Sequence, residues 1–514
     1  MNEEWNELLA NLPAYFGGHM RLSMAALTAA LAISLPLGIV ASRRPKLSES
    51  ILAIAGVVQT VPSLALLGLM MLLLGGLIGF WPAFLTLVIY SVLPILANTV
   101  IGIRGVDPML IEAALGLGMN DRQRLWRVEL PLAAPVILAG VRTATVMIVG
   151  TATLATTVGG ESLGNYIFAG LATLNYTATM FGCLAAAVLA VSLDQLVHLL
   201  EIAARRRSKI LAYPAVFGLL LVSAAGLIEP AKRWVAGGDK RVVIANAAWT
   251  EQYILSHTLA QAVEDAGYRP DRREGMAYGL QLLALKHNDV DCLVTYTGDI
   301  WSMLMKRQDF QDSETTQKEV TRFLHDDFGG VVCLGNLGFD NAYALAVTTQ
   351  RANAHQMKSI THLIRHAKTL GRPLRIGGDI AVFQRKEWPR LKQKYQLHDQ
   401  DVHPVAMDQT LTYAAVRDDQ VDAIIAYTSD GRVEAFKLQL LTDPEQVFPP
   451  YDAILLMSPA GAKRPGLREA LEPLLGKIER TTMQRANGQV DLDKFPPRIA
   501  AKWLLNAIPK GEQR

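Results

Sequence analysis

Charge is missing from a long part of the N-terminal half of this chain. Between Ser50 and Ile103, 54 residues contain no Asp, Glu, Lys or Arg, whereas charges recur every few residues after Asp239. Soluble core helices seldom run so long without charge, which argues against a fully soluble protein. At 514 residues the chain is also too long for one ordinary domain. We therefore expect a multi-domain protein with a lipid-facing first half and a water-facing second half.

Metal-binding and redox motifs are also scarce. The three cysteines form no Cys-x-x-Cys pair and the ten histidines show no spacing such as His-Glu-x-x-His, so we expect neither a metal site nor a cofactor. A disulfide between Cys292 and Cys333 stays open. A net charge of +3 without a basic, aromatic-rich stripe argues against nucleic acid as a partner. No nucleophile is paired with a base, so the chain is not expected to be an enzyme.

Several uncharged runs are long enough to cross a bilayer as helices. About 20 apolar helical residues span a hydrocarbon core of about 30 Å. Taking 51–80 as one span kinked at Val61-Pro62 predicts an all-α polytopic membrane domain of about six transmembrane helices. The expected spans lie near 22–42, 51–80, 82–103, 132–158, 177–202 and 210–228.

Basic residues beside these spans set the expected orientation. One cluster at 43–46 follows the first span and another at 205–209 lies between the last two, and the positive-inside rule places both in the cytoplasm. Four spans between them satisfy this parity, so the loop 104–131 also lies inside and the chain after Glu229 lies outside. The predicted parts are a transmembrane domain at 1–230, a linker at 231–239 and an extracytoplasmic domain at 240–514.

Two charged residues within the apolar runs and the first 20 residues of the chain lead to three further predictions. Arg142 is expected at the membrane interface, and Asp194 is either a structural partner or a pathway residue, because an ionised group is costly inside an apolar run. Residues 1–20 lack the basic start and small-residue cleavage site of a signal peptide, so we expect no cleavage there.

The expected cytoplasmic loop carries a spaced motif. It reads Glu112-Ala113-Ala114, then Gly118, and after nine residues Val128-Glu129-Leu130-Pro131. This spacing resembles the coupling loop of binding-protein-dependent ABC importer permeases. The resemblance implies a short helix, a glycine turn and a knob that enters a groove on an ATPase, with coupling roles for Glu112, Ala113, Ala114, Gly118 and Pro131.

That ATPase must be a separate chain. A phosphate-binding G-x-x-x-x-G-K-[ST] motif is missing, since the nearest candidate, Gly476-Lys477, has Leu471 in place of the first glycine. ATP hydrolysis is therefore expected in a partner subunit.

Strand-like runs alternate with helical periodicity after residue 240. The runs 241–246 and 290–294 are β-like, whereas 250–266 and 278–286 are helical. This alternation predicts an α/β domain with mostly parallel sheet, long enough for the two lobes of a periplasmic-binding-protein-like fold. We expect lobe 1 at about 240–342 and 432–507 and lobe 2 at about 343–431.

Four tyrosines lie beside small polar residues at the ends of apparent strands or in helical turns: Tyr296, Tyr343, Tyr413 and Tyr427. With Trp249-Thr250-Glu251-Gln252 and Phe448-Pro449-Pro450-Tyr451, their segments resemble the glycine betaine, choline and carnitine binding proteins of ABC importers over most of 240–507. In those proteins tyrosines surround a trimethylammonium head. The resemblance implies cage roles for the four tyrosines, and contacts to the polar end of the solute from Thr250, Gln252, Asn341 and Thr297.

Together the two resemblances imply a permease fused to its substrate-binding protein, in the osmoprotectant uptake family and in the bacterial cytoplasmic (inner) membrane. Two copies are expected to form the pore within membrane lipid and to bind two copies of a separate ABC ATPase subunit. The small ligand is expected to be a quaternary-ammonium solute. Ala247-Ala248-Trp249 and Trp301 depart from the family pattern, so another betaine such as ergothioneine stays open. A membrane-anchored sensor is less favoured, because a cytoplasmic output domain is missing.

Overall fold

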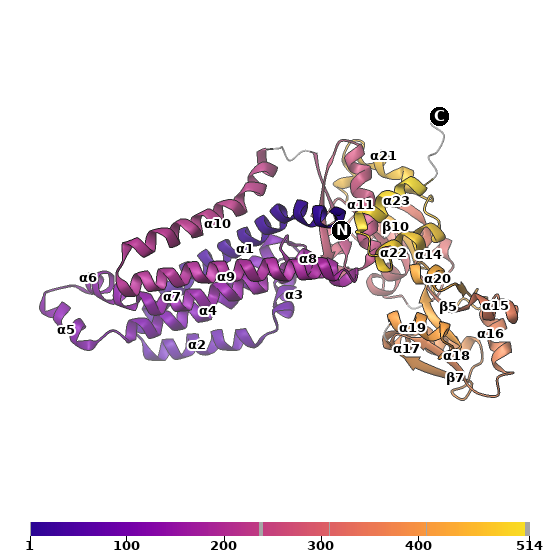
Figure 1. Cartoon of the computed structure of the whole chain (residues 1–514), viewed down its shortest axis with the longest axis horizontal. Coiled ribbons are helices and arrows are strands. Elements are labelled where there is room, and N and C mark those ends of the chain that lie inside the picture. Colours follow the sequence, from indigo (N-terminus) through magenta and orange to yellow (C-terminus); the bar gives the residue numbers. More distant parts are fainter. Residues whose placement is uncertain (1, 236–239, 308, 408, 509–514) are drawn as a thin grey trace. The chain divides into compact units, whose positions relative to one another are not determined.

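A computed structural model of the chain describes residues 2–235, 240–307, 309–407 and 409–508. They form two compact units, residues 1–240 with 273–284 and residues 241–272 with 285–514. The first half is helical, and strands occur only after residue 240 in the described residues (Figure 1). The linker expected at 231–239 begins inside α10 (Lys209–Val235), and residues 236–239 lie outside the described residues.

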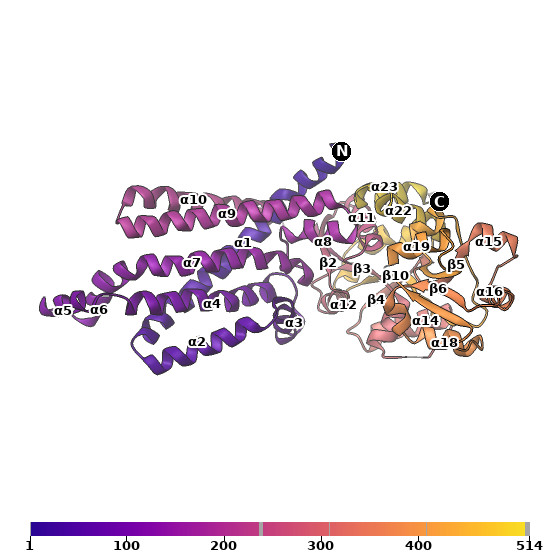
Figure 2. The same ribbon diagram turned by 60° about the horizontal axis from the view of Figure 1, so that its bottom comes forward.

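Apolar helices dominate the first unit. Five are long and apolar enough to cross a membrane, and the bent pair α2 and α3 makes a sixth candidate. The bend of 101° falls at Val61-Pro62, where the sequence predicts a kink because Pro62 has no backbone N–H to donate (Figure 2). The helices are α1 (Asn2–Ser42), α2 (Pro45–Thr60), α3 (Ser63–Leu73), α4 (Phe80–Arg104), α7 (Leu130–Ala152), α9 (Tyr176–Arg206) and α10.

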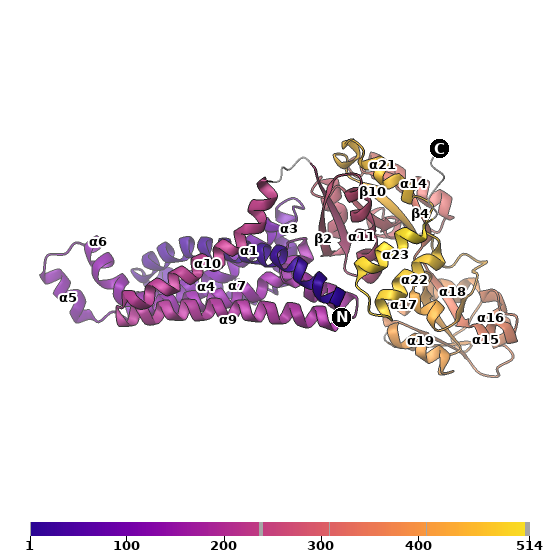
Figure 3. The same cartoon turned by 45° about the horizontal axis from the view of Figure 1, so that its top comes forward.

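Shorter helices connect these spans. On one side of the bundle the chain between α4 and α7 folds into α5 (Pro108–Gly116), α6 (Asp121–Arg124) and the π-helix η1 (Leu125–Glu129). Between α7 and α9 lie the 3-10 helix η2 (Thr153–Val158) and α8 (Gly164–Ala172). Figures 1 and 3 show α5 and α6 beyond the ends of the long helices.

The long helices pack as neighbours, α1 against α4, α4 against α7 and α7 against α9. A Cβ at Gly140 of α7 would lie 2.6 Å from the Pro94 carbonyl oxygen of α4, so only glycine allows this close approach. Between α7 and α9, the Arg142 guanidinium donates to both carboxylate oxygens of Asp194, at 2.5 and 2.8 Å. Of the two roles expected for Asp194, the structural partner is therefore present.

Each of the two sheets of the α/β region is mixed. The first has the order β2-β1-β3-β10-β4, with β1 and β3 parallel and β10 antiparallel to β3 and β4. The second has the order β7-β6-β8-β5-β9, with β6 parallel to β7 and β8, and β5 antiparallel to β8 and β9. The reversed strands, β5 and β10, are the first ones after the chain passes into their sheets. The strands are β1 (Arg241–Ala247), β2 (Arg269–Met276), β3 (Cys292–Tyr296), β4 (Val332–Asp340), β5 (Tyr343–Thr348), β6 (Leu374–Gly378), β7 (Val402–Ala406), β8 (Ala423–Tyr427), β9 (Leu438–Leu440) and β10 (Asp452–Met457).

The chain passes between the sheets twice, through residues 341–342 and through 441–451. Strand β9 belongs to the second sheet although the sequence boundary placed residues from 432 onward in lobe 1. Cys292 on β3 and Cys333 on β4 are separated by β10, and both are free thiols. A disulfide between them is therefore not formed.

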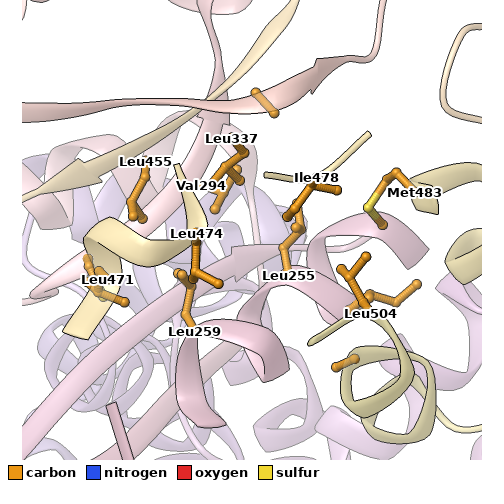
Figure 4. Close-up of a cluster of buried hydrophobic side chains, with 14 of the residues drawn as sticks. Leu255, Leu259, Val294, Leu337, Leu455, Leu471, Leu474, Ile478, Met483 and Leu504 are labelled. Carbon is orange, nitrogen blue, oxygen red and sulfur yellow. The ribbon is translucent and has the colours of Figure 1, made fainter. Parts of the chain in front are cut away.

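A large apolar core stabilises the first sheet. Leu455 of β10 and Leu259 of α11 face the apolar side chains of the C-terminal helices (Figure 4). Helices α11, α22 and α23 pack against one another (Figure 3). The helices that accompany the strands are α11 (Thr250–Asp265), α12 (Tyr278–Lys286), α13 (Thr297–Asp299), η4 (Ile300–Leu304), α14 (Ser313–Asp326), α15 (Thr349–Ala354), α16 (Ile360–Ala367), α17 (Ile380–Gln384), α18 (Glu387–Lys394), α19 (Gln409–Arg417), α20 (Gly431–Ala435), η5 (Gly461–Lys463), α21 (Leu467–Leu471), η6 (Glu472–Leu474), α22 (Arg480–Asp491) and α23 (Pro497–Ala507).

Candidate functional site

Two of the expected cage tyrosines lie side by side in the second sheet. Tyr343 begins β5 and Tyr427 ends β8, and the antiparallel register pairs them directly. Their ring centroids are 4.8 Å apart with an interplanar angle of 31°, and their hydroxyl oxygens are 3.0 Å apart. Both side chains are half-buried. The β-sheet register alone therefore creates a pair of aromatic rings at the end of this sheet.

Tyr296 ends β3 of the first sheet and is paired with a second aromatic ring. Its centroid lies 6.5 Å from that of Trp249, with the rings stacked at 29°. The Tyr296 hydroxyl donates to the Glu251 carboxylate and accepts the Gln252 side-chain amide at 3.4 Å. Burial raises the pKa of Tyr296, and the adjacent Glu251 charge raises it further. The ring is therefore held neutral and fixed.

Glu251, in the first turn of α11, connects these aromatic residues to the passage between the sheets. Its buried carboxylate also accepts the Asn341 side-chain amide at 3.2 Å and the Asn487 side-chain amide at 2.9 Å. Burial raises the pKa of Glu251, although these hydrogen bonds oppose the shift. Glu251 is not among the site residues predicted from the sequence. The signal that could indicate it is an acidic residue in the first turn of a predicted helix, inside the Trp-Thr-Glu-Gln segment.

Arg385 and Tyr451 complete the aromatic surroundings. The Arg385 guanidinium donates to the Tyr451 hydroxyl at 2.9 Å, and its carbon lies 5.4 Å from the centroid of the Tyr343 ring. Gly298 packs against Tyr451, since a Cβ there would lie 2.7 Å from the ring. Burial raises the pKa of Tyr451. Arg385 is not among the site residues predicted from the sequence, because no local sequence pattern distinguishes it from arginines on the protein surface.

The other residues expected to contact the solute bind within the protein. Tyr413 is completely buried on α19, and its hydroxyl donates to Asp430 at 2.7 Å. The Thr250 hydroxyl donates to Asp491 at 2.6 Å, and the Thr297 hydroxyl accepts the Asp452 backbone N–H at 3.0 Å. The structure thus brings together Tyr296, Gln252 and Asn341 around Glu251, and Tyr343 with Tyr427, whereas it places Tyr413, Thr250 and Thr297 in other contacts.

Trp301, which departs from the family pattern, contacts two nearby residues of the chain, Asp309 and Arg307. Its indole N–H donates to the Asp309 carbonyl at 2.8 Å, and the Arg307 guanidinium lies 3.9 Å from its ring centroid.

Among the described residues no group of three or more His, Cys, Asp or Glu side chains is arranged to hold a metal ion.

The loop between α4 and α7 contains the helix and the glycine turn that its motif predicts. Glu112, Ala113 and Ala114 lie on α5, whose N-terminus is capped by the Asp107 carboxylate accepting the Met109 N–H at 2.9 Å. Gly118 ends the turn with φ of +76°, a conformation that disfavours side chains. Pro131 is the second residue of α7, which directly continues the π-helix η1. Glu112 and Ala113 are exposed, whereas Ala114 packs inward.

Comparison with known families covers both halves of the chain. Residues 34–206 match the binding-protein-dependent transport system inner membrane component, and residues 240–506 match the substrate binding domain of the ABC-type glycine betaine transport system. The two matches agree with the transmembrane and α/β regions described above. They show a transport protein rather than an enzyme, and the apolar helices place its permease domain in the inner membrane.

Two individual sequence relatives give the same result. The ergothioneine transport permease/ergothioneine binding protein EgtU of Helicobacter pylori (strain G27) is 30% identical over 490 residues, 92% of this chain and 86% of that protein. The choline transport system permease protein OpuBB of Bacillus subtilis (strain 168) is 43% identical over 183 residues, 36% of this chain and 83% of that protein. A crystal structure of a glycine betaine/carnitine/choline ABC transporter is 26% identical, with a TM-score of 0.48 over 52% of this chain and 97% of that one. Since the first relative extends over nearly the whole chain, the protein belongs to the family of fused permeases and substrate-binding proteins of osmoprotectant-type ABC importers.

Proposed function

We propose that the chain captures a quaternary-ammonium solute on its α/β domain and passes it through a pore formed by its membrane domain. The observation that carries this proposal is the paired rings of Tyr343 and Tyr427, with the Arg385 guanidinium over Tyr343. A trimethylammonium group has no N–H to donate, so it binds to the negative faces of aromatic rings, at about 0.5–2 kcal/mol per ring.

Arg385 is our candidate for the residue that binds the carboxylate of the solute. Its side chain is 40% exposed, and its guanidinium has donors beyond those directed at Tyr451 and Glu387. Arginine binds carboxylates through paired, charge-assisted hydrogen bonds. A betaine that carries both a trimethylammonium group and a carboxylate would therefore engage the tyrosine pair and Arg385 together.

Within this class, two observations favour ergothioneine as a second candidate beside glycine betaine, choline and carnitine. A relative named as an ergothioneine permease and binding protein extends over 92% of the chain. The stacked Trp249 and Tyr296 provide a second aromatic pair, which suits a solute that has a flat ring in addition to its ammonium head.

The proposed assembly contains two copies of this chain and two copies of a separate ABC ATPase subunit that docks on α5 and the Gly118 turn. In this arrangement the α/β domain faces the periplasm or the cell exterior and needs no cofactor of its own. A binding domain fused to its permease reaches the pore in an intramolecular step, at effective concentrations on the order of millimolar. Co-purification of an ATPase with the full chain, lost on deletion of 108–118, would support the docking site; an ATPase retained after the deletion would contradict it.

The solute is identified by calorimetric titration of the full chain in nanodiscs with glycine betaine, choline, carnitine and ergothioneine. We compare Tyr427→Leu, which removes the ring, with Tyr427→Phe, which keeps the ring and loses only the hydroxyl. We expect Leu to weaken binding about tenfold or more and Phe to change it less than about threefold.

Arg385→Gln tests the carboxylate end. It should weaken binding of the three carboxylate-bearing solutes about tenfold and leave choline, which has no carboxylate, nearly unchanged. Binding of none of the four solutes by the wild-type chain would refute the solute class.

A further inference from the structure

The coupling loop between α4 and α7 has two ends, which we call its roots: Arg104 before the loop and Glu129 after it. Both roots bind the C-terminal end of α1. Helix α1 ends at Ser42, where the last carbonyls of a helix have no partner within the helix. Arg104, the last residue of α4, donates to the Ala41 and Ser42 carbonyls, each at 3.1 Å. The first root of the loop is thus fixed to α1.

Glu129 binds the same end of α1 from the second root. Its carboxylate is fully buried and forms ion pairs with Arg43, which follows α1, and with Arg124 of α6 at 2.8 Å. Arg124 also pairs with Asp121 at 3.0 Å. A buried carboxylate held by two guanidinium groups resists separation, because loss of one partner leaves an uncompensated charge away from water.

The position of Glu129 in the chain connects this ion pair to the loop. It is the last residue of the π-helix η1, which runs directly into α7. Single-turn π-helices are frequent at functional sites, where they shift the register of a helix. Between Arg104 and Glu129 lie α5 and the Gly118 turn, so every residue of the proposed docking surface lies between two attachments to α1.

We propose that Arg104 and the triad Arg43–Glu129–Arg124 are positioning residues that transmit displacement of the coupling loop to α1. This inference rests on the proposed function, in which an ATPase moves that loop. Because both roots hold the residues from Ala41 to Arg43, a shift of α5 moves the end of α1 with it. Helix α1 packs against α4, α7 and α10, so its displacement reaches much of the bundle.

The test uses the full chain reconstituted with its ATPase subunit in proteoliposomes and measures solute taken up per ATP hydrolysed. Glu129→Gln and Arg104→Gln are compared with Arg44→Gln, which alters an exposed arginine of the same basic cluster. Arg104→Gln leaves Glu129 paired and keeps the inference testable should Glu129→Gln fail to fold. We expect both variants to retain the ATPase but to lower uptake per ATP about fivefold or more, with Arg44→Gln at the wild-type ratio and Glu129→Asp restoring part of it.

An unchanged ratio in folded Glu129→Gln or Arg104→Gln would overturn the inference, because a purely structural role lowers the amount of transporter and not this ratio. A wild-type chain without solute-stimulated ATP hydrolysis would refute the proposed function instead. In that event hydrogen exchange at residues 39–43 of the full chain in nanodiscs tests the attachment by itself. Exchange should quicken about tenfold in Arg104→Gln relative to Arg44→Gln, and equal exchange in the two would overturn it.

Discussion

Asp491, the last residue of α22, is an acid whose ionised form is disfavoured by the folded domain. Its carboxylate is largely buried and accepts the Thr250 hydroxyl at 2.6 Å. Burial raises the pKa of Asp491 to about 6 from its ordinary 3.8, although the Thr250 hydrogen bond and the Arg432 charge oppose the shift; Asp430 adds to it. We therefore expect Asp491→Asn, which keeps the size and an acceptor for Thr250, to stabilise the domain at neutral pH.

The sign of this effect follows from proton binding. Since the folded pKa of Asp491 is above the unfolded one, the folded state binds more protons between about pH 4 and pH 6, and stability falls as pH rises through that window. A shift of about two pKa units corresponds to about 3 kcal/mol at pH 7, and partial exposure reduces this to about 2–3 kcal/mol. The substitution should recover that amount at pH 7.5 and only about 0.5 kcal/mol near pH 4, where the folded state is protonated and the unfolded state is about 40% protonated.

The assay is urea unfolding of residues 240–514, which contain both sheets and their cores, at pH 7.5 and near pH 4. Asp493→Asn, at an exposed acid two residues away, is the matched control and should change the unfolding free energy by less than about 0.5 kcal/mol. Equal stability of Asp491→Asn and wild type at pH 7.5, or the same gain at both pH values, would refute the assignment of a raised pKa to Asp491.

Three further predictions test packing and charge elsewhere. Gly298→Ala places a Cβ 2.8 Å from the Pro450 carbonyl oxygen and against the Tyr451 ring, so solute affinity by calorimetry should fall about tenfold, whereas Gly279→Ala, with no atom within 4 Å of its Cβ, should leave it unchanged. Leu455→Ala empties a fully buried position and should lower the unfolding free energy in urea by about 3–5 kcal/mol; a loss below about 1 kcal/mol would contradict the packing in Figure 4. Asp194→Asn unpairs Arg142 and should destabilise the full chain in detergent by roughly 1–3 kcal/mol, with part of the loss recovered in the double variant Asp194→Asn/Arg142→Gln.

The sequence predicts the membrane half well, because hydropathy and proline act locally. The break at Val61-Pro62, the helix that carries Glu112 and the glycine turn at Gly118 all occur where the pattern indicates. The direction of β5 and β10 could not be predicted in this way. A strand's direction depends on how the chain enters its sheet, and alternating strands and helices carry no sign of a passage between sheets.

The same distinction explains the candidate site. Tyr343 and Tyr427 lie together because of the sheet register, which their separate sequence contexts only hint at. Tyr413 has an equally suggestive context, but it lies on the buried face of α19, where Asp430 takes its hydroxyl. Glu251 escaped notice because an acid in a first helical turn is common on exposed helices. Only the tertiary structure shows that this one is buried among hydrogen-bond donors.

Two residues of the candidate functional site, Asn341 and Tyr451, lie on the passages between the two sheets. Asn341 lies on the first passage and Tyr451 ends the second, and the Asn341 backbone N–H donates to the Tyr451 carbonyl at 2.9 Å. The two passages are therefore hydrogen-bonded to each other beside the rings. Since Tyr296 is fixed to Glu251 on α11, a change of backbone dihedrals in either passage moves Tyr343 and Tyr427 relative to Tyr296. Under the proposed function, a solute that touches both ring pairs would therefore favour, by its binding energy alone, the arrangement in which the two ring pairs approach each other.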